Sequence, residues 1–332
     1  MIQPRFQAVA DDVWCIDTEI YRPGLAACYL VRGGGRLAFI DTGASNSVPH
    51  LLAVLAALGH GPEDVDWVVP IHVHLDHAGG AGRLMQQCPR ARLGIHPRGA
   101  PHMIDPSRLT AGATAVYGEE GLAAAFGAMV PIPPERVEVL EDGSEIDLGG
   151  RHLTFLDTPG HANHHGCIWD PRTRGCFTGD TFGIAYKELY GTAGPYLFAP
   201  TTPVAFDPDA WQLSLDRLMA LDPQAIFLTH FGRLDRPAAM IDALRQSIRD
   251  QATLALEVAS AGPLGRSDRL RAAIAEHLTA GARACGSTLD DGRIREVLAV
   301  DMDLNAQGLE VWLVRRERRS ASASSAPGPA PG

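Results

Sequence analysis

The stretch His72-Val73-His74-Leu75-Asp76-His77 gathers three histidines and an aspartate within six residues, directly after an apolar run (65–71) typical of a buried strand. On an extended segment, His72 and His74 point to the same side, two residues apart. A tight turn that begins a helix can then bring Asp76 and His77 round to face them. Because neutral imidazole and carboxylate are ligands for Zn²⁺, and also for Fe and Mn, we interpret the stretch as a metal site rather than as structural histidines.

The sequence around this stretch predicts alternating strands and helices. Short apolar runs at 27–31 and 36–40, joined by Arg32-Gly33-Gly34-Gly35, indicate a β-hairpin. Further strands are expected at 92–96, 137–140, 152–156, 166–169, 175–178 and 225–229, and helices at 47–58, through 84–85 and at 208–220. The segment 97–135, rich in Gly, Pro and Ala, is expected to form loops and short helices over the site. Open α/β sheets place their sites at the C-terminal ends of strands, where the histidine stretch lies.

The chain changes character after residue 235. Apolar residues follow helical spacing from Met240 to Ile248 and from Leu270 to Leu278, and an apolar run closes the segment at 309–314. The region 240–298 is too apolar to be solvated all round, so we expect it to cover the site or to form a dimer contact. These patterns divide the chain into a domain with the histidine stretch at 1–235, a mainly helical extension at 236–318 and a disordered tail at 319–332.

The histidine stretch is similar to the His-x-His-x-Asp-His signature of hydrolases with the metallo-β-lactamase fold, and the resemblance covers about Val13 to Gly232. It implies further ligands at strand ends, and the chain supplies them as His161 in Thr158-Pro159-Gly160-His161, Asp180 in Phe177-Thr178-Gly179-Asp180 and His230 in Leu228-Thr229-His230-Phe231-Gly232. The resemblance implies that one metal is held by His72, His74 and His161. It assigns a second metal to Asp76, His77 and His230, with Asp180 bridging the two.

The same resemblance implies an α+β fold of four layers, an αββα sandwich of two facing sheets, here with a C-terminal helical appendage. It implies a hydrolase with two divalent metals, zinc in the first place and iron or manganese as alternatives. A metal-bridging hydroxide would attack an ester, thioester or lactone of a small molecule. Asp76 and Asp180 are the candidate catalytic residues, as acceptors of the proton from that water. No Gly-x-Ser-x-Gly motif offers a serine nucleophile.

Departures from the family pattern narrow the choice of reaction. Asp180 and the absence of a visible signal peptide favour the glyoxalase II and lactonase branches. Lactonases of the fold tend to carry Tyr where this chain has Gly183, which weakens that choice. One alternative is a mononuclear-iron persulfide dioxygenase, whose arginine-containing stretch after the bridging Asp is missing from 181–194. Another is a binding or regulatory protein with a vestigial site, although such a site should have lost a ligand.

Other residues are candidates for supporting roles. His165 matches a position that usually lies behind the site in this family, and Asp41 is expected to organise a loop and a ligand. Pocket-lining or core positions are open for a set of histidines and tyrosines, some of which are candidates for polarising a substrate carbonyl: His96, His102, His164, Tyr117, Tyr186, Tyr190 and Tyr196.

The composition restricts partners and location. The 332 residues include 39 acidic and 29 basic side chains, and a formal charge of −10 argues against a nucleic-acid partner. Six scattered cysteines without a Cys-x-x-Cys pair indicate no disulfide framework. No apolar run is long enough to cross a bilayer. We therefore expect a cytoplasmic protein that binds a small-molecule substrate and engages no membrane, with a homodimer as a candidate assembly.

Overall fold

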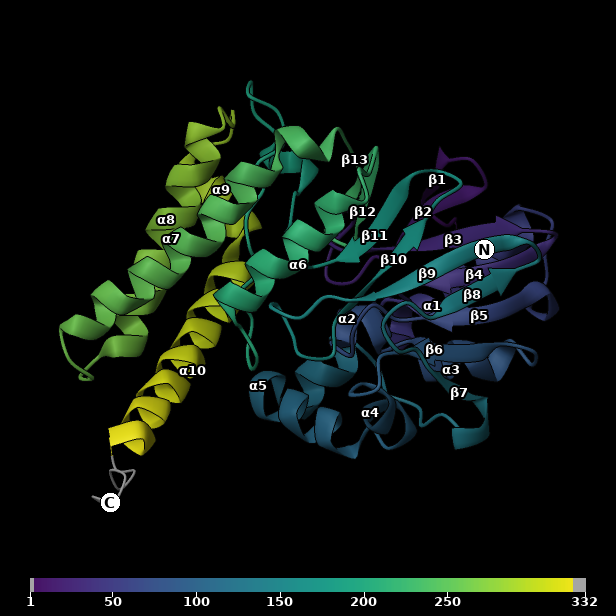
Figure 1. Ribbon diagram of the computed structural model, residues 1–332, viewed down its shortest axis with the longest axis horizontal. Helices are drawn as coiled ribbons and strands as arrows, with labels where there is room; N and C mark the ends of the chain where they lie inside the picture. The colour runs from purple at the N-terminus through teal and green to yellow at the C-terminus, as the bar shows by residue number, and fades with distance from the viewer. Residues whose placement is uncertain (1–2, 325–332) are drawn as a thin grey trace, which may run out of the picture.

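The computed structural model describes residues 3–324, which form two β-sheets packed face to face between outer helices (Figure 1). The first sheet has seven strands, which are neighbours in chain order: β1 (Phe6–Ala10), β2 (Val13–Asp17), β3 (Ala27–Gly33), β4 (Arg36–Ile40), β5 (Val65–Val69), β6 (Arg92–Ile95) and β7 (Val137–Val139). The hairpin expected around Gly33 to Gly35 joins β3 and β4, which pair antiparallel. From β4 to β7 the strands run parallel, so their carboxyl ends share one edge.

The second sheet has six strands in the spatial order β13, β12, β11, β10, β9 and β8. Their bounds are β8 (Glu145–Leu148), β9 (Arg151–Asp157), β10 (Gly166–Asp170), β11 (Gly175–Gly179), β12 (Ala225–Leu228) and β13 (Gly232–Asp235). Every residue of the central strands β11 and β12 is buried, whereas β8 and β13 at the edges alternate buried and exposed residues. This difference is expected when only the middle of a sheet is covered on both faces.

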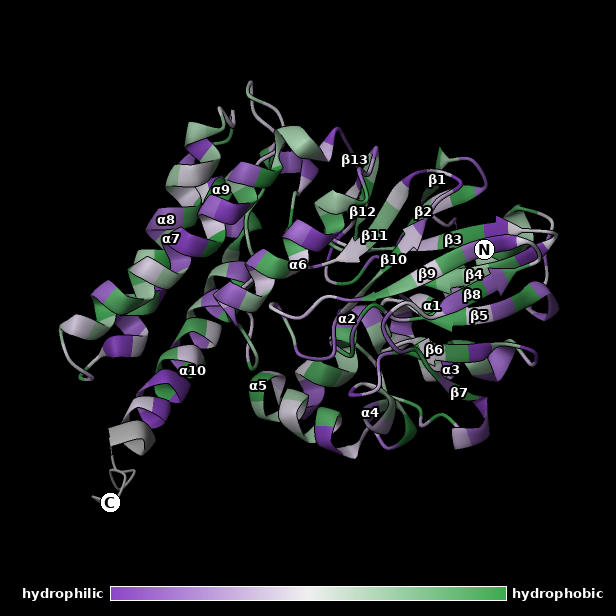
Figure 2. Ribbon diagram, in the orientation of Figure 1, coloured by the Kyte–Doolittle hydropathy of each residue, from purple (hydrophilic) through white to green (hydrophobic). Residues whose placement is uncertain are grey.

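Helices cover the outer faces of both sheets. Side chains of α1 (Val48–Ala57), α3 (Ala81–Gln87) and α4 (Ala100–Ile104) pack on the first sheet. Those of α6 (Pro208–Ala220) pack on the second. Between the sheets, apolar residues of both interlock around Tyr29, Phe177 and Phe227. In Figure 2 the strands are mainly green and the helices mix green with purple, as expected for amphipathic helices on an apolar sandwich.

An appendage of four helices follows the sandwich: α7 (Ile241–Ser260), α8 (Arg266–Ala284), α9 (Asp291–Val297) and α10 (Ala299–Ser324). Helix α7 contacts α6, and α10 packs along α8 and α7 (Figure 1). The rings of Phe206 and Trp312 meet at 5.7 Å, and both belong to the apolar cluster that α6 shares with the appendage. The four-layer α+β fold with C-terminal helices is therefore confirmed.

One local expectation is confirmed and another needs correction. The segment expected as loops and short helices contains α4 and α5 (Ser107–Ala125), and α5 consists of two short helical stretches that meet at Gly118, whose backbone is not helical. Only Leu122 of α5 is buried, which explains its weak periodicity. The expected tail at 319–332 overlaps the last turns of α10, and its part from 325 onward lies outside the described residues. A four-residue helix, α2 (Leu75–Ala78), and short 3₁₀ turns complete the described elements: Ser45–Ser47, Pro62–Asp64, Pro134–Arg136, Lys187–Leu189 and Pro237–Ala239.

Two further properties follow from residues 3–324. All six cysteines have free thiols and five are buried, in agreement with the expected absence of a disulfide framework. None of the helices in this range combines the length and the apolar character needed to span a bilayer.

Candidate metal centre

The seven side chains expected as ligands follow the ends of four strands. The stretch from His72 to His77 comes after β5, and His161 lies in the loop after β9. Asp180 directly follows β11, and His230 is the second residue after β12. Since these strand ends meet at one edge of the sandwich, residues far apart in the chain come together there, and they form two neighbouring groups.

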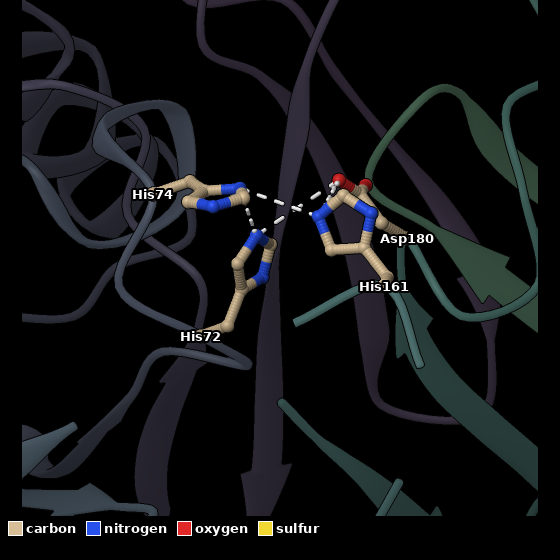
Figure 3. A group of neighbouring side chains, drawn as sticks. All are labelled: His72, His74, His161 and Asp180. Atoms are coloured by element: carbon tan, nitrogen blue, oxygen red, sulfur yellow. Dashed lines mark hydrogen bonds and ion pairs between the residues drawn. The ribbon is translucent and has the colours of Figure 1, made fainter. Parts of the chain in front are cut away.

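The first group consists of His72, His74, His161 and Asp180, whose ligand atoms all lie within 4.8 Å of one another (Figure 3). Nδ1 of His74 is 2.8 Å from Nε2 of His72 and 3.3 Å from Nε2 of His161. Oδ2 of Asp180 lies 3.2 Å from Nε2 of His161 and 3.9 Å from Nε2 of His72. Three imidazoles and one carboxylate oxygen thus face a common centre.

The second group consists of Asp76, His77 and His230. Oδ2 of Asp76 lies 3.1 Å from Nε2 of His230 and 3.7 Å from Nε2 of His77. Oδ1 of Asp180 is 3.5 Å from each of the same two nitrogen atoms. The two oxygens of Asp180 therefore face different groups, as a carboxylate between two cations would.

The outer ring nitrogens show which way three of the imidazoles are oriented. Nδ1 of His161 donates to the carbonyl of Pro200 at 2.8 Å, and Nδ1 of His230 donates to the carbonyl of Leu25 at 2.7 Å. Nδ1 of His77 lies 2.7 Å from a carboxylate oxygen of Asp41. A proton held at Nδ1 leaves the lone pair of a neutral imidazole at Nε2, which points into the centre in each case.

Burial and neighbouring charges shift the pKa values of the histidines and of Asp180 in the centre. Burial opposes a charge on His230, but Asp180 and Asp76 outweigh it and raise its pKa to about 9. Burial lowers the pKa of His72 well below its ordinary value. Burial alone would raise the pKa of Asp180, yet His77, His161 and His230 hold that pKa well below its usual range. The carboxylates thus favour positive charge in the centre, whereas burial disfavours a charge on the imidazoles.

A divalent cation in each group would supply the positive charge that the carboxylates favour and would leave the imidazoles neutral. Nε2 of His77 and Oδ1 of Asp180 are buried and make no hydrogen bond within the described residues, although both face the second group. Nitrogen and carboxylate oxygen donors of this kind suit Zn²⁺, with Fe and Mn as further possibilities. The residues present therefore fit two neighbouring divalent metals.

Residues behind the centre hold the ligands in place. Asp41, which has a positive φ of 60°, accepts hydrogen bonds from the backbone of Ile71 and the hydroxyl of Thr229, in addition to its contact with His77. It therefore ties the ends of β5 and β12 to one ligand, as expected of an organising residue.

His165 also lies behind the centre. Its Nε2 accepts from the backbone N–H of Asp180 at 3.3 Å, and its Nδ1 lies 3.1 Å from the hydroxyls of Thr158 and Thr181. The preceding Gly179 has φ +47°, and a Cβ there would come within 2.4 Å of Ile71 and 2.9 Å of His165. The absence of a side chain at 179 therefore lets Asp180 approach the histidines.

A pocket of about 440 Å³ opens onto the centre and exposes His74, Asp76, Asp180 and His230. Of the histidines and tyrosines considered from sequence, four line it: His102, His164, Tyr117 and Tyr186. The other three are elsewhere. His96 contacts Asp157, Tyr196 stacks on Phe198 in the core, and Tyr190 is half-buried away from the pocket.

Helix α10 contributes to this pocket, which was not predicted from the sequence. Its first turns supply Val300, Asp301, Leu304 and Asn305 to the lining, although the expected cover ended at 298. Asp301 accepts a hydrogen bond from the hydroxyl of Tyr186 at 3.2 Å, and burial raises the pKa of Asp301 to about 7. Asp301 and Asn305 stand one helical turn apart on a helix that is otherwise apolar on that face, a signal that the sequence contained.

Two stacked sheets with histidine and aspartate donors at one edge define a class of metal-binding hydrolases. A family model described as the metallo-beta-lactamase superfamily matches residues 21–230, and the chain belongs to this superfamily. The assignment to this family from the histidine stretch is thereby confirmed.

Known relatives and structures agree with the family. A metallo-beta-lactamase fold-containing protein of Sulfurisphaera tokodaii, ST1585, is 27% identical over 68% of this chain and 80% of its own length. Its crystal structure has a TM-score of 0.57, with 26% identity, 72% of this chain covered and 86% of the other. A hydroxyacylglutathione hydrolase of Acidiphilium cryptum is 30% identical over 60% of this chain and 61% of its own. The acyl-coenzyme A thioesterase MBLAC2 of Gallus gallus is 29% identical over 51% and 62%.

Proposed function

We propose that this chain is a metal-dependent hydrolase of esters or thioesters with two divalent metals per chain. The observation that carries the proposal is that Asp180 turns one carboxylate oxygen toward His72 and His161 and the other toward His77 and His230. When bound, two such metals supply a water of lowered pKa and polarise the carbonyl of the substrate. Two of the relatives, by their names, cleave thioesters, which supports this choice of bond.

The side chains of the site have three proposed roles: metal ligands, proton acceptor and substrate positioning. His72, His74 and His161 would hold one metal, Asp76, His77 and His230 the second, and Asp180 would bridge them. The side chain of Asp76 is 27% exposed, against 6% for Asp180, so Asp76 is the better placed of the two to accept a proton from a water in the pocket. His164 and Tyr186 line the pocket beside the ligands and position the substrate.

The second group of side chains favours the hydrolase over the iron dioxygenase alternative. A mononuclear site would need only a set such as His72, His161 and Asp180, and it would leave Asp76, His77 and His230 as a buried acceptor cluster without a function. Keeping such a cluster uncompensated would be costly. A binding protein with a vestigial site would not need all seven donors either, and the structure brings all seven together.

Metal analysis and substrate assays test the proposal together. Protein reconstituted with zinc, iron or manganese should hold close to two metals per chain by elemental analysis. It should hydrolyse members of a panel of thioesters, esters and lactones at the same rate with and without oxygen, and leave phosphodiesters intact. One iron per chain, together with oxygen uptake on a glutathione persulfide, would replace the hydrolase with the dioxygenase.

A further inference from the structure

The mouth of the pocket is lined by apolar side chains that are open to solvent. Eight large hydrophobic side chains are exposed within residues 3–324, and half of them line this pocket: Tyr21, Val116, Val204 and Val300, with exposed fractions of 51%, 53%, 67% and 40%. They come from the loop between β2 and β3, from α5, from the loop before α6 and from the first turn of α10. Exposed apolar residues that converge from four separate segments indicate a binding surface.

The interior of the pocket continues this apolar character. The rings of Tyr21 and Tyr117 each contact the ring of Phe126, with centroid distances of 5.6 and 5.3 Å. Leu109 from α5 and Leu304 from α10 also line the pocket, which opens onto the metal ligands. Two helices from different parts of the chain therefore supply apolar walls next to the reacting centre.

Charged groups that could receive a polar substrate are few. Apart from histidines and the carboxylates of the metal centre, the charged lining residues in the described chain are Arg108 and Asp301. Asp301 already accepts a hydrogen bond from Tyr186, and Arg108 is exposed. A free carboxylate on the acyl chain could pair only with the exposed Arg108. It would also lose its hydration against apolar side chains, which is unfavourable.

We infer that the substrate carries an extended, uncharged hydrocarbon acyl chain, which lies between α5 and α10 with its ester or thioester carbonyl at the metal centre. This inference rests on the proposed function and adds the class of acyl group to it. It also gives the appendage a role in specificity, because α10 supplies one of the two walls.

A homologous series of thioesters tests the inference in the full-length, metal-loaded protein. N-acetylcysteamine thioesters of acetate, butyrate, hexanoate, octanoate and decanoate share one leaving group and differ only in the acyl chain. Each methylene that enters the pocket should raise kcat/KM roughly fourfold until the chain outgrows it. The glutaryl thioester should react much more slowly than the pentanoyl thioester of equal length. A flat profile, or a preference for glutaryl, would overturn the inference and leave the hydrolase intact.

Matched valine variants locate the binding surface. The double variant Val116→Thr/Val300→Thr keeps the side-chain shape and adds two hydroxyls, so the ratio of octanoyl to acetyl activity should fall several-fold. Val139→Thr is the control, since Val139 is 45% exposed on β7 and lies outside the pocket. Its ratio should equal that of the parent. Equal ratios in the double variant and the control would also overturn the inference.

A binding measurement separates failure of the inference from failure of the proposed function. Decanamide cannot be hydrolysed readily, and isothermal titration calorimetry should show that it binds more tightly than butanamide, with a negative heat-capacity change. If decanamide binds in this way and no ester or thioester is cleaved, the proposed function is wrong and the apolar site stands. If esters are cleaved and the two amides bind alike, the apolar site is wrong.

Discussion

The backbone carbonyl of Pro200 accepts a hydrogen bond from Nδ1 of His161 at 2.8 Å, and this bond connects the C-terminal appendage to the metal centre. The residues on either side of Pro200 are held by the appendage: Asn305 of α10 donates to the carbonyl of Ala199 and accepts from the backbone N–H of Thr201. Gln251 of α7 donates to the same Ala199 carbonyl at 2.7 Å. The orientation of one candidate metal ligand, His161, therefore depends on helices far from it in sequence.

Asn305→Ala should weaken metal binding although Asn305 is not expected to touch a metal. Its removal leaves the backbone N–H of Thr201 without its partner and loosens the carbonyl that orients His161. We expect the affinity for one of the two metals to fall about 10–100-fold, as is typical of residues behind a ligand. Graded chelator competition with metal analysis measures this change. The control is Asp303→Ala on the same helix, whose exposed ion pair with Arg271 should not matter to metal affinity.

Asp180→Asn should cause the largest loss in the centre. The substitution removes a negative charge between two dications, whose repulsion in a buried site is strong. We expect the variant to lose metal as well as rate, by more than the 10–100-fold typical of changes behind the ligands. Elemental analysis after dialysis, together with kcat on the best thioester, reports both. Two retained metals with an unchanged kcat would contradict the bridging role.

His165→Ala should have a graded effect on the same measurements. His165 accepts from the backbone N–H of Asp180 and contacts two threonine hydroxyls but does not line the pocket. Metal affinity should therefore fall only about 10–100-fold, with activity recovered at high metal concentration. His152→Ala provides the comparison, because that side chain is 56% exposed, and it should behave like the parent. Activity that excess metal cannot restore would instead point to a catalytic part for His165.

Gly308→Ala should separate α10 from the sandwich. A Cβ at this helical position would lie 1.5 Å from the carbonyl oxygen of Thr201, a backbone atom that cannot move aside on its own. Overpacking of this kind costs about 1–3 kcal/mol of stability or more, and thermal unfolding should show a lowered Tm. Gly121→Ala in α5 is the matched control. Its Cβ would meet only Tyr117 at 3.7 Å, so it should stabilise the helix by about 0.5–1 kcal/mol.

The reactivity of the cysteines should depend on pH and on folding. Burial raises the pKa of Cys15 to about 12 and that of Cys88 to about 11. Since the thiolate is the reactive form, raising the pKa lowers its population, to roughly one in a thousand at pH 8 for a pKa of 11. Iodoacetamide at pH 8 should label the native protein only at the half-buried Cys285, because the other five thiols are buried. Labelling of Cys15 and Cys88 should begin only at strongly alkaline pH. Mass spectrometry should find six labels after unfolding in denaturant.

The local pattern of the sequence was enough for much of the fold. The helix expected at 208–220 agrees with α6, because it begins with Asp207 as an N-cap that accepts from Ala210 and with Pro208 at its first position. The strand at 36–40 agrees with β4, since a continuous apolar run bounded by a glycine turn has few other interpretations. Edge strands were harder. β13 was not predicted, because it has only four residues, two of them exposed, and it begins at Gly232, where the motif around His230 ends.

For the site, the sequence by itself determined which seven side chains to expect as metal ligands, because three histidines and an aspartate lie within six residues and His161, Asp180 and His230 follow predicted strands. Only the tertiary structure decided what surrounds them. The bond from His161 to Pro200, the links of Asp41 to His77 and Thr229, and the apolar wall of α10 join residues between 36 and 188 positions apart or from separate helices. Periodicity and motifs report contacts within a few residues of the chain, whereas these contacts arise when sheet edges and helices pack together, and so no local pattern encodes them.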